Sequence, residues 1–404
     1  MSERLLIIGA GMEQIRAYQI AKKMGLLVVG TDMNPEAPAF VYADDRLIAS
    51  TRNVSETLKV VGDYAKIKPI NGVMTIANDV PLTVAAVANK LKLPGISVDA
   101  ARIANNKLPM KECFTKHDIA TPKYHKLKTR KEFYKAIEQS TFPLILKPSD
   151  GRGSRGVLYL EKDSDLEWAW TYALQCSDNK IIMLEEYIAG PQLSVEGIFI
   201  DGHYQAIAFA DRNYDNLPKT KPYIVEDGGV IPSHFEGKIL DQISLLIEKA
   251  SLSLGISWGT VKADIVISKD RPYIIELAAR LSGNYLATHH IPMAYGVEIV
   301  PALINLSLGK SISVNQLIPK YKKYLGVRYF FPTPGTIKKI QGVNEVRKRP
   351  YLKMLDIYSE PGDKQLPITS HVNRAGTVIC KADTYVTAKQ RVEEAVKDIK
   401  FIVV

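Results

Sequence analysis

The sequence has few cysteines and no long hydrophobic run. Its 404 residues include three cysteines, Cys113, Cys176 and Cys380. They are far apart and odd in number, so the sequence predicts neither a disulfide framework nor a CxxC metal site. The apolar runs are strand-sized, far shorter than the roughly 20 residues of a membrane helix. The opening residues, MSERLLIIGAG, show no basic region with an apolar core and cleavage site. We therefore expect a cytoplasmic protein without a secretion signal or a membrane partner.

The sequence also lacks a concentrated charge of one sign. The net charge is +10, from 53 basic and 43 acidic residues, but the two kinds are interspersed. The basic runs are short, at 126–131 and 347–349, and none is interleaved with stacking aromatic residues. The pattern favours a solvated surface, with nucleotide phosphates as a second explanation. It predicts no nucleic-acid partner.

What is present is typical of a globular chain of two or three domains. Hydrophobic residues make up 46% and charged residues 24%. In the first hundred residues, short apolar runs alternate with helical patterns, which indicates a parallel sheet covered by helices on both faces. We expect a Rossmann-like unit with strands at 5–8, 26–29 and 72–76, and helices after residue 11 and at 55–66 and 81–92.

This unit has an incomplete dinucleotide fingerprint. Gly9 and Gly11 supply the first two glycines of GxGxxG, but Gln14 stands at the third position. Asp32 lies about where a ribose-binding acid would, within a sequence that also reads as a turn. The residues favour a tight turn in a scaffold domain over NAD binding.

The remaining chain divides into two segments. Residues 101–310 mix strands and helices, and residues 311–404 are rich in lysine and β-forming residues and are predicted to close with a helix near 387–400. In the middle segment we expect helices from residue 107 and at 237–254 and 297–308, and strands at 144–147, 181–185, 193–200, 203–210, 261–268 and 272–277.

A glycine-rich loop follows the strand that ends in Lys147. The loop contains Gly151, Gly153 and Gly156 and leads into a second apolar strand. Glycines let backbone N–H groups approach an anion, and a lysine adds positive charge. The loop differs from a Walker motif because no GK[ST] opens a helix. It is interpreted as a phosphate-binding loop, with an ordinary hairpin turn as the alternative.

The next motif has the elements of an adenine pocket. A strand ends in Glu185 and Glu186 and is followed by a Gly-Pro turn. Adenine needs an apolar slot, a backbone donor and acceptor, and an acceptor for its amino group. Glu185 and the backbone around Ile188 are candidates for these contacts. The alternative is a solvated strand end.

Paired carboxylates mark a third motif. Asp264 and Glu276 lie on two short strands joined by a turn, at offsets that predict neighbouring positions in a hairpin, and Arg280 follows. Like charges on adjacent strands repel unless a cation lies between them. Mg²⁺ bound to nucleotide phosphates takes one or two carboxylates. The pattern therefore predicts a magnesium site.

In this order, the motifs resemble the ATP-grasp superfamily, especially the carboxylate–amine (L-amino-acid) ligases and the group of biotin carboxylase and the carbamoyl-phosphate synthetase large subunit. The resemblance covers essentially the whole chain. It implies a mixed α/β and α+β fold with a Rossmann-like pre-ATP-grasp domain (1–100), a two-lobed ATP-grasp domain (101–310) with a mobile lid at about 120–187, and a small α+β C-terminal domain (311–404).

The resemblance also assigns roles to residues. It implies that Asp264 and Glu276 hold Mg²⁺, with Mn²⁺ as an alternative ion. It implies that Arg280 faces an acyl phosphate and that Lys147 contacts the transferring phosphate, which makes these two the catalytic residues. The residues it assigns to ATP are Lys107, Lys147, Ser149, Gly151, Gly153, Ser154, Gly156, Glu185, Glu186, Tyr187, Ile188 and Gln192.

Two positions depart from the family pattern. Related ligases have an acid after the hinge Gly-Pro that binds the ribose, and this chain has Gln192. The metal strand of the family often reads Glu-x-Asn, whereas Ala278 stands here. Glu196 is retained close to the hinge, with another role or none.

Several smaller features of the sequence each allow a structural and a functional interpretation. His289 and His290 are interpreted as structural residues, with a contact to a substrate carboxylate or a role as a base as the alternative. The segment 227–232 resembles a substrate-side passage of amino-acid ligases and is otherwise a glycine turn. Cys113 and Cys176 lie in helical patterns and are predicted to be core residues.

The expected activity is an ATP-dependent ligation. A carboxylate attacks the γ-phosphate to give an acyl phosphate and ADP, and an amine displaces phosphate. The partners are then ATP and small carboxylate and amine substrates, and the resemblance allows a homodimer. Two alternatives stay open: a carboxylase-type relative that activates bicarbonate, and a nucleotide-binding protein without turnover.

Overall fold

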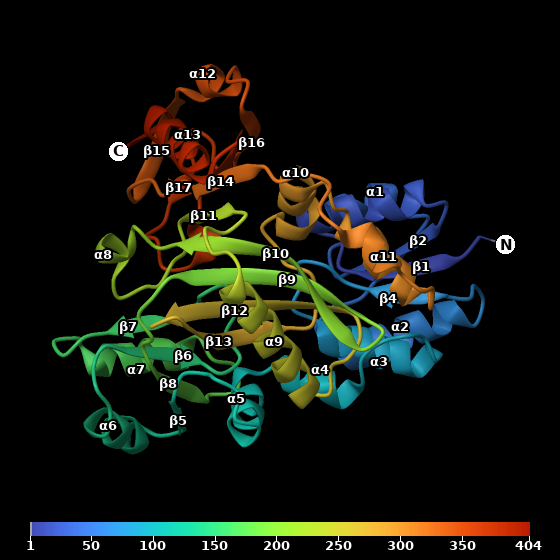
Figure 1. The fold of residues 1–404 in the computed structure, drawn as a ribbon, viewed down its shortest axis with the longest axis horizontal. Helices are drawn as coiled ribbons and strands as arrows, with labels where there is room; N and C mark the ends of the chain where they lie inside the picture. Colours follow the sequence, from blue (N-terminus) through green and yellow to red (C-terminus); the bar gives the residue numbers. More distant parts are fainter. Residues whose placement is uncertain (1) are drawn as a thin grey trace.

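A computed structural model describes residues 2–404 (Figure 1). The first element of the fold is a four-stranded parallel sheet of order β3-β2-β1-β4. Its strands β1, β2 and β4 are buried because they carry near-continuous apolar runs, whereas the edge strand β3 is mostly exposed. Helices lie between the strands, so the predicted Rossmann-like unit is confirmed. Its elements are β1 Arg4–Ile8, α1 Ile15–Lys23, β2 Leu27–Asp32, β3 Asp45–Ile48, α2 Val54–Ala65, β4 Gly72–Met74 and α3 Pro81–Leu91.

A small antiparallel sheet of order β5-β8-β6-β7 forms a separate lobe. Two helices pack on it through Phe133 and Trp170, which share a core with Leu146 and Leu158. The first of these helices begins at a capping box formed by Thr129 and Glu132. The lobe contains β5 Tyr124–Leu127, α6 Arg130–Glu138, β6 Leu144–Pro148, β7 Leu158–Leu160, α7 Leu166–Gln175 and β8 Ile182–Glu186. It is joined to the first sheet by α4 Val98–Ala104 and α5 Lys107–Lys116.

An eight-stranded sheet forms the centre of the molecule, in the order β13-β12-β9-β10-β11-β14-β18-β16. The helix α9 packs on one face of it (Figure 1). The strands are β9 Gln192–Ile200, β10 His203–Asn213, β11 Gly228–Ile231, β12 Thr260–Ser268, β13 Arg271–Ala278, β14 Tyr324–Tyr329, β16 Leu352–Ile357 and β18 Gly376–Ala382. The associated helices are α8 Leu217–Thr220, α9 Lys238–Ser253 and α10 Ile291–Tyr295. The helix α11 (Ile299–Ser307) instead packs on β4 and α1 of the first unit.

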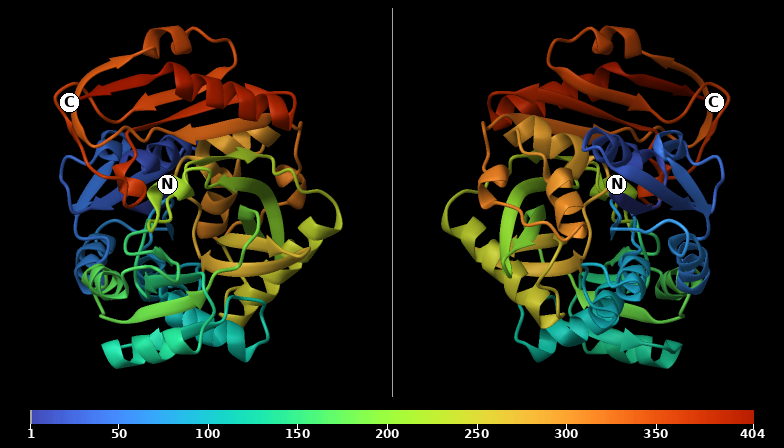
Figure 2. Two further views of the ribbon diagram at one scale, coloured as in Figure 1. Left: turned by 90° about the vertical axis from the view of Figure 1, so that its left-hand side faces the viewer. Right: turned by 90° about the vertical axis from the view of Figure 1, so that its right-hand side faces the viewer.

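The third segment continues this sheet, because β11 pairs with β14. Its helix α13 (Tyr385–Asp398) packs on β14 and β18 and lies over the rest of the molecule in Figure 2. The predicted closing helix at 387–400 is wrong at its end, since α13 stops at Asp398. A strand β19 (Lys400–Val403) follows and pairs with β15 (Gly335–Gln341), which also pairs with β17 (Lys364–Gln365). The remaining helix is α12 Val343–Arg347.

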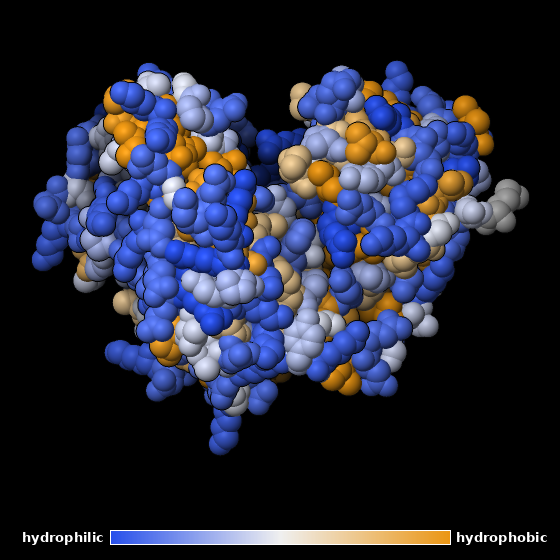
Figure 3. Space-filling model, turned by 90° about the horizontal axis from the view of Figure 1, so that it is seen from above, coloured by the Kyte–Doolittle hydropathy of each residue, from blue (hydrophilic) through white to orange (hydrophobic). Residues whose placement is uncertain are grey.

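The surface is mostly hydrophilic. Seen from above, apolar side chains form patches on both sides of an indentation (Figure 3). The large exposed hydrophobic residues are spread along the sequence, from Met12 to Val404. Within residues 2–404, no helix is long and apolar enough to cross a membrane.

Candidate active site

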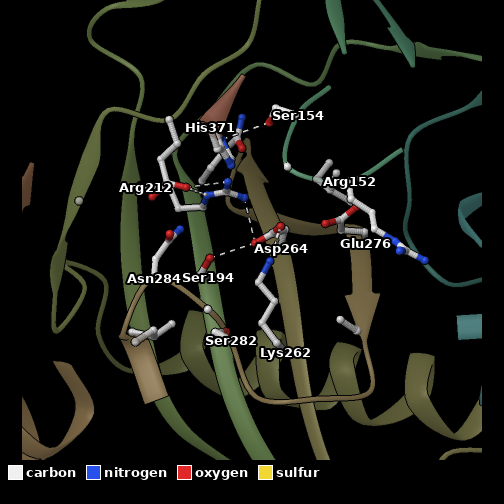
Figure 4. A pocket seen from close by; sticks show the side chains of 18 of the residues that line it. Arg152, Ser154, Ser194, Arg212, Lys262, Asp264, Glu276, Ser282, Asn284 and His371 are labelled. Atoms are coloured by element: carbon white, nitrogen blue, oxygen red, sulfur yellow. Dashed lines mark hydrogen bonds and ion pairs between the residues drawn. The ribbon is translucent and has the colours of Figure 1, made fainter. Parts of the chain in front are cut away.

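A cavity of about 1040 Å³ lies where the small sheet, the central sheet, the first segment and the third segment of the chain meet. Its lining includes the glycine loop, the ends of β6, β8, β12 and β13, the turn after β1, and the segment before β18. Figure 4 shows Lys262, Asp264 and Arg212 close together in this cavity, with Ser154 and His371 nearby. All twelve residues predicted to bind ATP except Ser149 and Gly156 line it, as do both predicted metal ligands and Arg280.

Lys147 and Glu185 form a buried ion pair at the base of the small lobe. The ammonium of Lys147 lies 2.8 Å from one carboxylate oxygen of Glu185, and Lys111 lies 3.5 Å from the other. Burial raises the pKa of Glu185, but the charges of Lys111 and Lys147 outweigh it and hold this pKa below its usual value. Burial lowers the pKa of Lys111 to about 8. Two cations therefore stand around one carboxylate, which leaves excess positive charge beside the cavity.

Lys107 connects the glycine loop to the paired carboxylates. It starts α5, where Asn106 caps the helix, and its ammonium donates to the carbonyl of Gly151 at 2.7 Å. The same ammonium lies 3.2 Å from Glu276. The charge of Lys107 is the main cause that holds the pKa of Glu276 well below its usual range, so this carboxylate is ionised at neutral pH.

The glycine loop has a fixed base. Asp150 accepts bonds from the Ser177 hydroxyl at 3.0 Å and from the Asn179 backbone N–H at 2.8 Å, and Asn179 also bonds Ser149 at 2.9 Å. Gly153 has φ +61° and no atom within 4 Å of an added Cβ, so its conformation, rather than crowding, favours glycine.

The tip of the loop touches the third segment of the chain. Ser154 lies 3.1 Å from the His371 ring, and the His371 backbone N–H donates to the carbonyl of Gly153 at 3.2 Å. Figure 4 shows this contact at the edge of the cavity. Nothing in the sequence pattern indicated His371, because it comes more than 200 residues after the loop.

The predicted adenine hinge follows β8. Glu186, Tyr187 and Ile188 line the cavity, as does Gln192 at the start of β9. The apolar residues Ile145, Met110 and Leu277 line the same cavity. Ile145 pairs with Glu185 across the small sheet, and the backbone N–H of Leu277 donates to the Met110 sulfur at 3.4 Å. The carboxylate of Glu185 points instead to the two lysines described above.

The two predicted metal ligands are brought together. Asp264 and Glu276 are register partners on β12 and β13, as predicted. Asp264 is surrounded by donors: Arg212 at 2.9 Å, Lys262 at 2.5 Å and the Ser194 hydroxyl at 3.0 Å. Figure 4 shows these contacts.

The donor set fits a magnesium ion that also binds phosphates. Two carboxylates stand on adjacent strands in the cavity, and cations hold each of them. Between residues 2 and 404, no group of three His, Cys, Asp or Glu side chains is placed to hold a metal by itself. Mg²⁺ does not need such a cage, since it keeps waters and uses substrate phosphates as ligands.

Arg280 is fixed by an acid from the first sheet. Its guanidinium forms two hydrogen bonds with Asp79, at 2.8 and 2.6 Å. Asp79 lies in the loop before α3, so this pair joins the Rossmann-like unit to the end of β13. The side chain lines the cavity, as the resemblance implies.

Glu196 has a structural place. It lies fully buried in β9 and accepts the backbone N–H of Ser282 at 3.0 Å. No ion pair is formed by its carboxylate among the described residues. Burial raises its pKa to about 7. Glu196 lies outside the cavity lining, so its role differs from that of the ribose-binding acid in related ligases.

Several cavity residues were missed from sequence. Arg212 on β10 pairs with Glu226 at 2.8 Å as well as with Asp264. Glu13 lies in the turn after β1, and Arg374 lies two residues before β18. The charged residues at the end of the apolar strand β10 were a usable signal for Arg212. The other two follow no local pattern.

The smaller predictions have mixed outcomes. His290 is buried, lines the cavity and has its pKa lowered to about 3 by burial, whereas His289 is half-buried. Gly229 lines the cavity in β11, where an added Cβ would lie 1.9 Å from a backbone oxygen. Cys113 and Cys176 are both half-buried. Cys113 packs at the edge of a hydrophobic core, in partial agreement with the prediction.

In the turn after β1, the polar groups of the incomplete dinucleotide fingerprint are bonded to other parts of the protein. The Gln14 amide donates to the carbonyl of Ile76 at 2.8 Å, and Asp32 accepts the backbone N–H groups of Ala10 and Asn34, each at 3.0 Å. Asp32 therefore organises the turn, in agreement with the scaffold interpretation.

A comparison with protein families matches residues 104–284 to the ATP-grasp domain. The chain contains an ATP-grasp domain. Residues 328–404 match the L-amino acid ligase C-terminal domain 2. The ATP-grasp match spans the small lobe, the cavity strands β12 and β13, and Arg280. Together, the two matches cover most of the chain beyond its first hundred residues.

The similar proteins of known name are distant relatives. The alanine–anticapsin ligase of Bacillus subtilis (strain 168) is 26% identical over 302 residues, which cover 68% of this chain and 62% of that protein. The present chain therefore spans less than two thirds of that relative.

Solved ATP-grasp structures share the fold. The L-amino acid ligase from Bacillus licheniformis has a TM-score of 0.83 at 21% identity and covers 100% of this chain and 99% of its own. The N5-carboxyaminoimidazole synthetase from Staphylococcus aureus, complexed with ADP, has a TM-score of 0.76 at 16% identity, covering 98% of each chain.

Proposed function

We propose that this protein is an ATP- and Mg²⁺-dependent carboxylate–amine ligase that acts on an amino acid or small carboxylate through an acyl phosphate. The observation that carries the proposal is the meeting of Lys107 with the glycine loop and with Glu276 in one cavity. An anion-binding loop, a cation and a paired-carboxylate site at one place suit phosphoryl transfer, which depends on positioning and charge. The C-terminal match to an L-amino acid ligase domain supports an amine as the second substrate.

Each part of the cavity has a role in the proposed reaction. ATP lies with its adenine against the hinge segment 186–188 and its phosphates under the glycine loop. An oxygen of the substrate carboxylate attacks the γ-phosphorus, and the bond to the β–γ bridging oxygen breaks with release of ADP. The amine nitrogen then attacks the carbonyl carbon, phosphate leaves, and the nitrogen loses a proton.

The charged residues neutralise the negative charge that develops during the reaction. Lys147 and Lys107 offset negative charge on the phosphates, and Arg280 offsets charge on the reacting oxygen. The glycine loop excludes water, which would hydrolyse the acyl phosphate. Asp264 and Glu276 are the proposed ligands of Mg²⁺, which when bound supplies charge neutralisation at the phosphate oxygens.

The metal assignment has a test that does not need turnover. Mg²⁺ added with ADP should raise the melting temperature of the wild-type protein above the value with ADP and a chelator, because a ligand of the native state stabilises it. Glu276→Gln should remove this increment, whereas Glu112→Gln, a surface control, should keep it. An increment that persists in Glu276→Gln would contradict the assignment.

Hydroxylamine tests the ligase reaction itself. Incubated with ATP, Mg²⁺ and pooled amino acids and small carboxylates, the enzyme should form a hydroxamate in step with ADP, because hydroxylamine traps an acyl phosphate. Lys147→Met should lose both products, while Lys126→Met, a lysine of the same lobe outside the cavity, should keep both. Circular dichroism checks that each variant is folded.

The bicarbonate alternative predicts a different result. ADP release that requires bicarbonate, with no hydroxamate or amide from any pooled substrate, would overturn the amine-ligase proposal. If none of the pooled substrates causes ADP release, the amine-ligase proposal would equally be excluded.

A further inference from the structure

Lys111 is a fully buried cation that has no role in the proposed reaction. Its exposed fraction is 0%, and it lies on α5 one turn after Lys107, on the same face of the helix. Lys107 lines the cavity, whereas Lys111 does not. Lysine is almost never fully buried without a partner, because an ammonium removed from water costs free energy. The groups around Lys111 therefore have to compensate its charge.

Two oxygen-bearing side chains contact the ammonium of Lys111. It donates to the hydroxyl oxygen of Thr121 at 2.6 Å. That hydroxyl donates in turn to the backbone carbonyl of Ile274 at 2.8 Å, so its lone pairs are left to face the ammonium. The second neighbour is Glu185, whose Oε1 lies 3.5 Å from the ammonium. Because Thr121 carries no charge, the compensating charge in contact with Lys111 is that of Glu185.

The carboxylate of Glu185 is shared between two cations that differ in position. Its Oε2 lies 2.8 Å from the ammonium of Lys147, whereas its Oε1 is buried and accepts no hydrogen bond among the described residues. Lys147 and Glu185 both line the cavity. Glu185 thus has one close cation that lines the cavity and one more distant cation that lies outside the lining.

This arrangement has a consequence for the binding of phosphates. A phosphate in the cavity competes with Glu185 for the ammonium of Lys147. When Lys147 turns to the phosphate, Glu185 loses its 2.8 Å partner, and a buried carboxylate without a partner is costly. Lys111 stands beside the oxygen of Glu185 that accepts no hydrogen bond, so it is placed to keep this carboxylate compensated.

We propose that Lys111 is a positioning residue for the phosphates of the nucleotide: it holds the Glu185 carboxylate so that Lys147 is free to bind them. This inference rests on the part of the proposed function that places ATP phosphates at Lys147. Lys111 touches no substrate in this scheme and acts through Glu185. With Lys111 charged, the three side chains carry one excess positive charge. Without it, Lys147 and Glu185 form a neutral pair that attracts phosphates less.

The test measures how much the phosphates of ADP add to its binding. Calorimetry at pH 7 with Mg²⁺ gives the dissociation constants of adenosine and of ADP, and their ratio isolates the phosphates from the adenine and ribose. In Lys111→Met, this ratio should fall about 10- to 100-fold, while the affinity for adenosine stays at the wild-type value. Lys116→Met, at an exposed lysine of the same helix, should keep the wild-type ratio. Circular dichroism checks that each variant is folded.

A double-mutant cycle tests whether Lys111 acts through Glu185. In Glu185→Gln, the carboxylate that Lys111 compensates is gone, so the addition of Lys111→Met should have little further effect on the ratio. A full additional loss would show that Lys111 acts by another route and would overturn the inference. Equal losses of adenosine and ADP affinity in Lys111→Met would assign Lys111 to the packing of the pocket and would overturn it as well.

The pH dependence of the wild-type ratio gives a second measurement. Burial lowers the pKa of Lys111 to about 8, although the charge of Glu185 acts against this change. The other titratable groups around it are Lys107 on α5, Tyr124 on β5 opposite Glu185, Lys147 on β6 and Glu276 on β13. Nearby lysines hold the pKa values of Glu185 and Glu276 low, and burial raises the pKa of Tyr124 above its usual value of 10, so these three groups do not titrate between pH 7 and 9.

Over this range Lys111 loses its proton, so the wild-type ratio should fall as the pH rises from 7 to 9, whereas the ratio of Lys111→Met should stay low and constant. The terminal phosphate of ADP ionises near pH 6 and does not add to this change. If Lys111→Met does not fold, a wild-type ratio that is constant between pH 7 and 9 overturns the inference.

The binding ratio separates this inference from the ligase proposal. An unchanged ratio in a folded Lys111→Met protein, together with normal hydroxamate formation by the wild type, overturns the role of Lys111 and leaves the ligase proposal in place. A ratio that falls in Lys111→Met while the wild type forms no hydroxamate or amide supports the role of Lys111 and overturns the ligase proposal.

Discussion

At the scale of single residues, the site is a set of buried charges that hold one another. Lys147, Lys111 and Glu185 are all buried, and the ionised carboxylate of Glu185 stabilises the charges of the two lysines that contact it. The sequence motif indicated Lys147 and Glu185 as separate ATP contacts. The structure shows them in direct contact, so the side chain of Glu185 positions a lysine. The contact of the hinge backbone with adenine stays a prediction.

Glu196 gives a prediction about stability and pH. Its pKa is raised from 4.5 to about 7 in the folded protein, so the folded state holds a proton that the unfolded state releases between these values. Its contribution to stability is therefore fully present below about pH 4.5 and is lost as the pH rises through 7. Glu196→Gln should be more stable than the wild type at pH 8, by on the order of 3 kcal/mol, and about equal at pH 4.5.

Urea unfolding of both proteins between pH 4.5 and 8 measures this difference. A gap between the two proteins that does not change with pH would show that Glu196 is ionised in the folded state throughout. Glu248→Gln, a change at a partly exposed acid of α9, should give a much smaller pH-dependent difference.

At the scale of elements, the glycine loop depends on a distant segment. Its base is bonded within the small lobe, but its tip contacts His371 through both a side chain and the backbone. Burial lowers the pKa of His371 to about 3, so the ring is neutral at working pH and its bond to Ser154 does not titrate there. The closed position of the loop is therefore stabilised by the C-terminal part of the chain.

This contact gives a prediction about water in the site. His371→Ala should loosen the loop tip and let water reach the acyl phosphate, so ADP should form in severalfold excess over hydroxamate. The wild-type ratio should not vary between pH 6 and 9 on account of this residue. His203→Ala, at an exposed histidine that begins β10, is the control.

An ADP-to-hydroxamate ratio that stays at the wild-type value in His371→Ala would show that the loop closes without this contact. A drop in both products by the same factor would instead assign His371 to the chemical step.

At the scale of the whole molecule, the C-terminal segment is part of the central sheet. β14 pairs with β11, and its residues Leu325 and Val327 share a hydrophobic core with Leu5 and Ile7 of the first strand. The predicted boundary at residue 310 thus falls between two strands of one sheet. Removal of the chain beyond this boundary would expose the edge of β11 and part of that core.

A truncated chain tests this dependence. Residues 1–322 should not give a soluble protein that unfolds cooperatively, because an uncovered strand edge and apolar core favour aggregation. Size-exclusion chromatography and thermal unfolding decide the point. A monomeric fragment with a melting temperature within a few degrees of the full chain would show that the two parts fold independently.

Local patterns determined much of this protein. The alternation of short apolar runs with helical patterns indicated the parallel first sheet, because side-chain periodicity is a property of neighbouring residues. The offsets of Asp264 and Glu276 predicted their pairing, since a short turn fixes the register of a hairpin. The glycine loop, Lys107 and Arg280 were identified by their order along the chain. The end of α13 was missed because the four residues of β19 are too few to show a strand pattern.

Only the tertiary structure decided which charges meet. Arg212, His371 and Arg374 reach the cavity from strands and turns far from the motifs, and Glu13 reaches it from the turn after β1. Such contacts depend on how strands from different segments join one sheet, and no local spacing encodes this. The sequence by itself predicted which residues bind phosphates and a metal. The fold decided what surrounds the substrate, because burial and partner charges are properties of the assembled molecule.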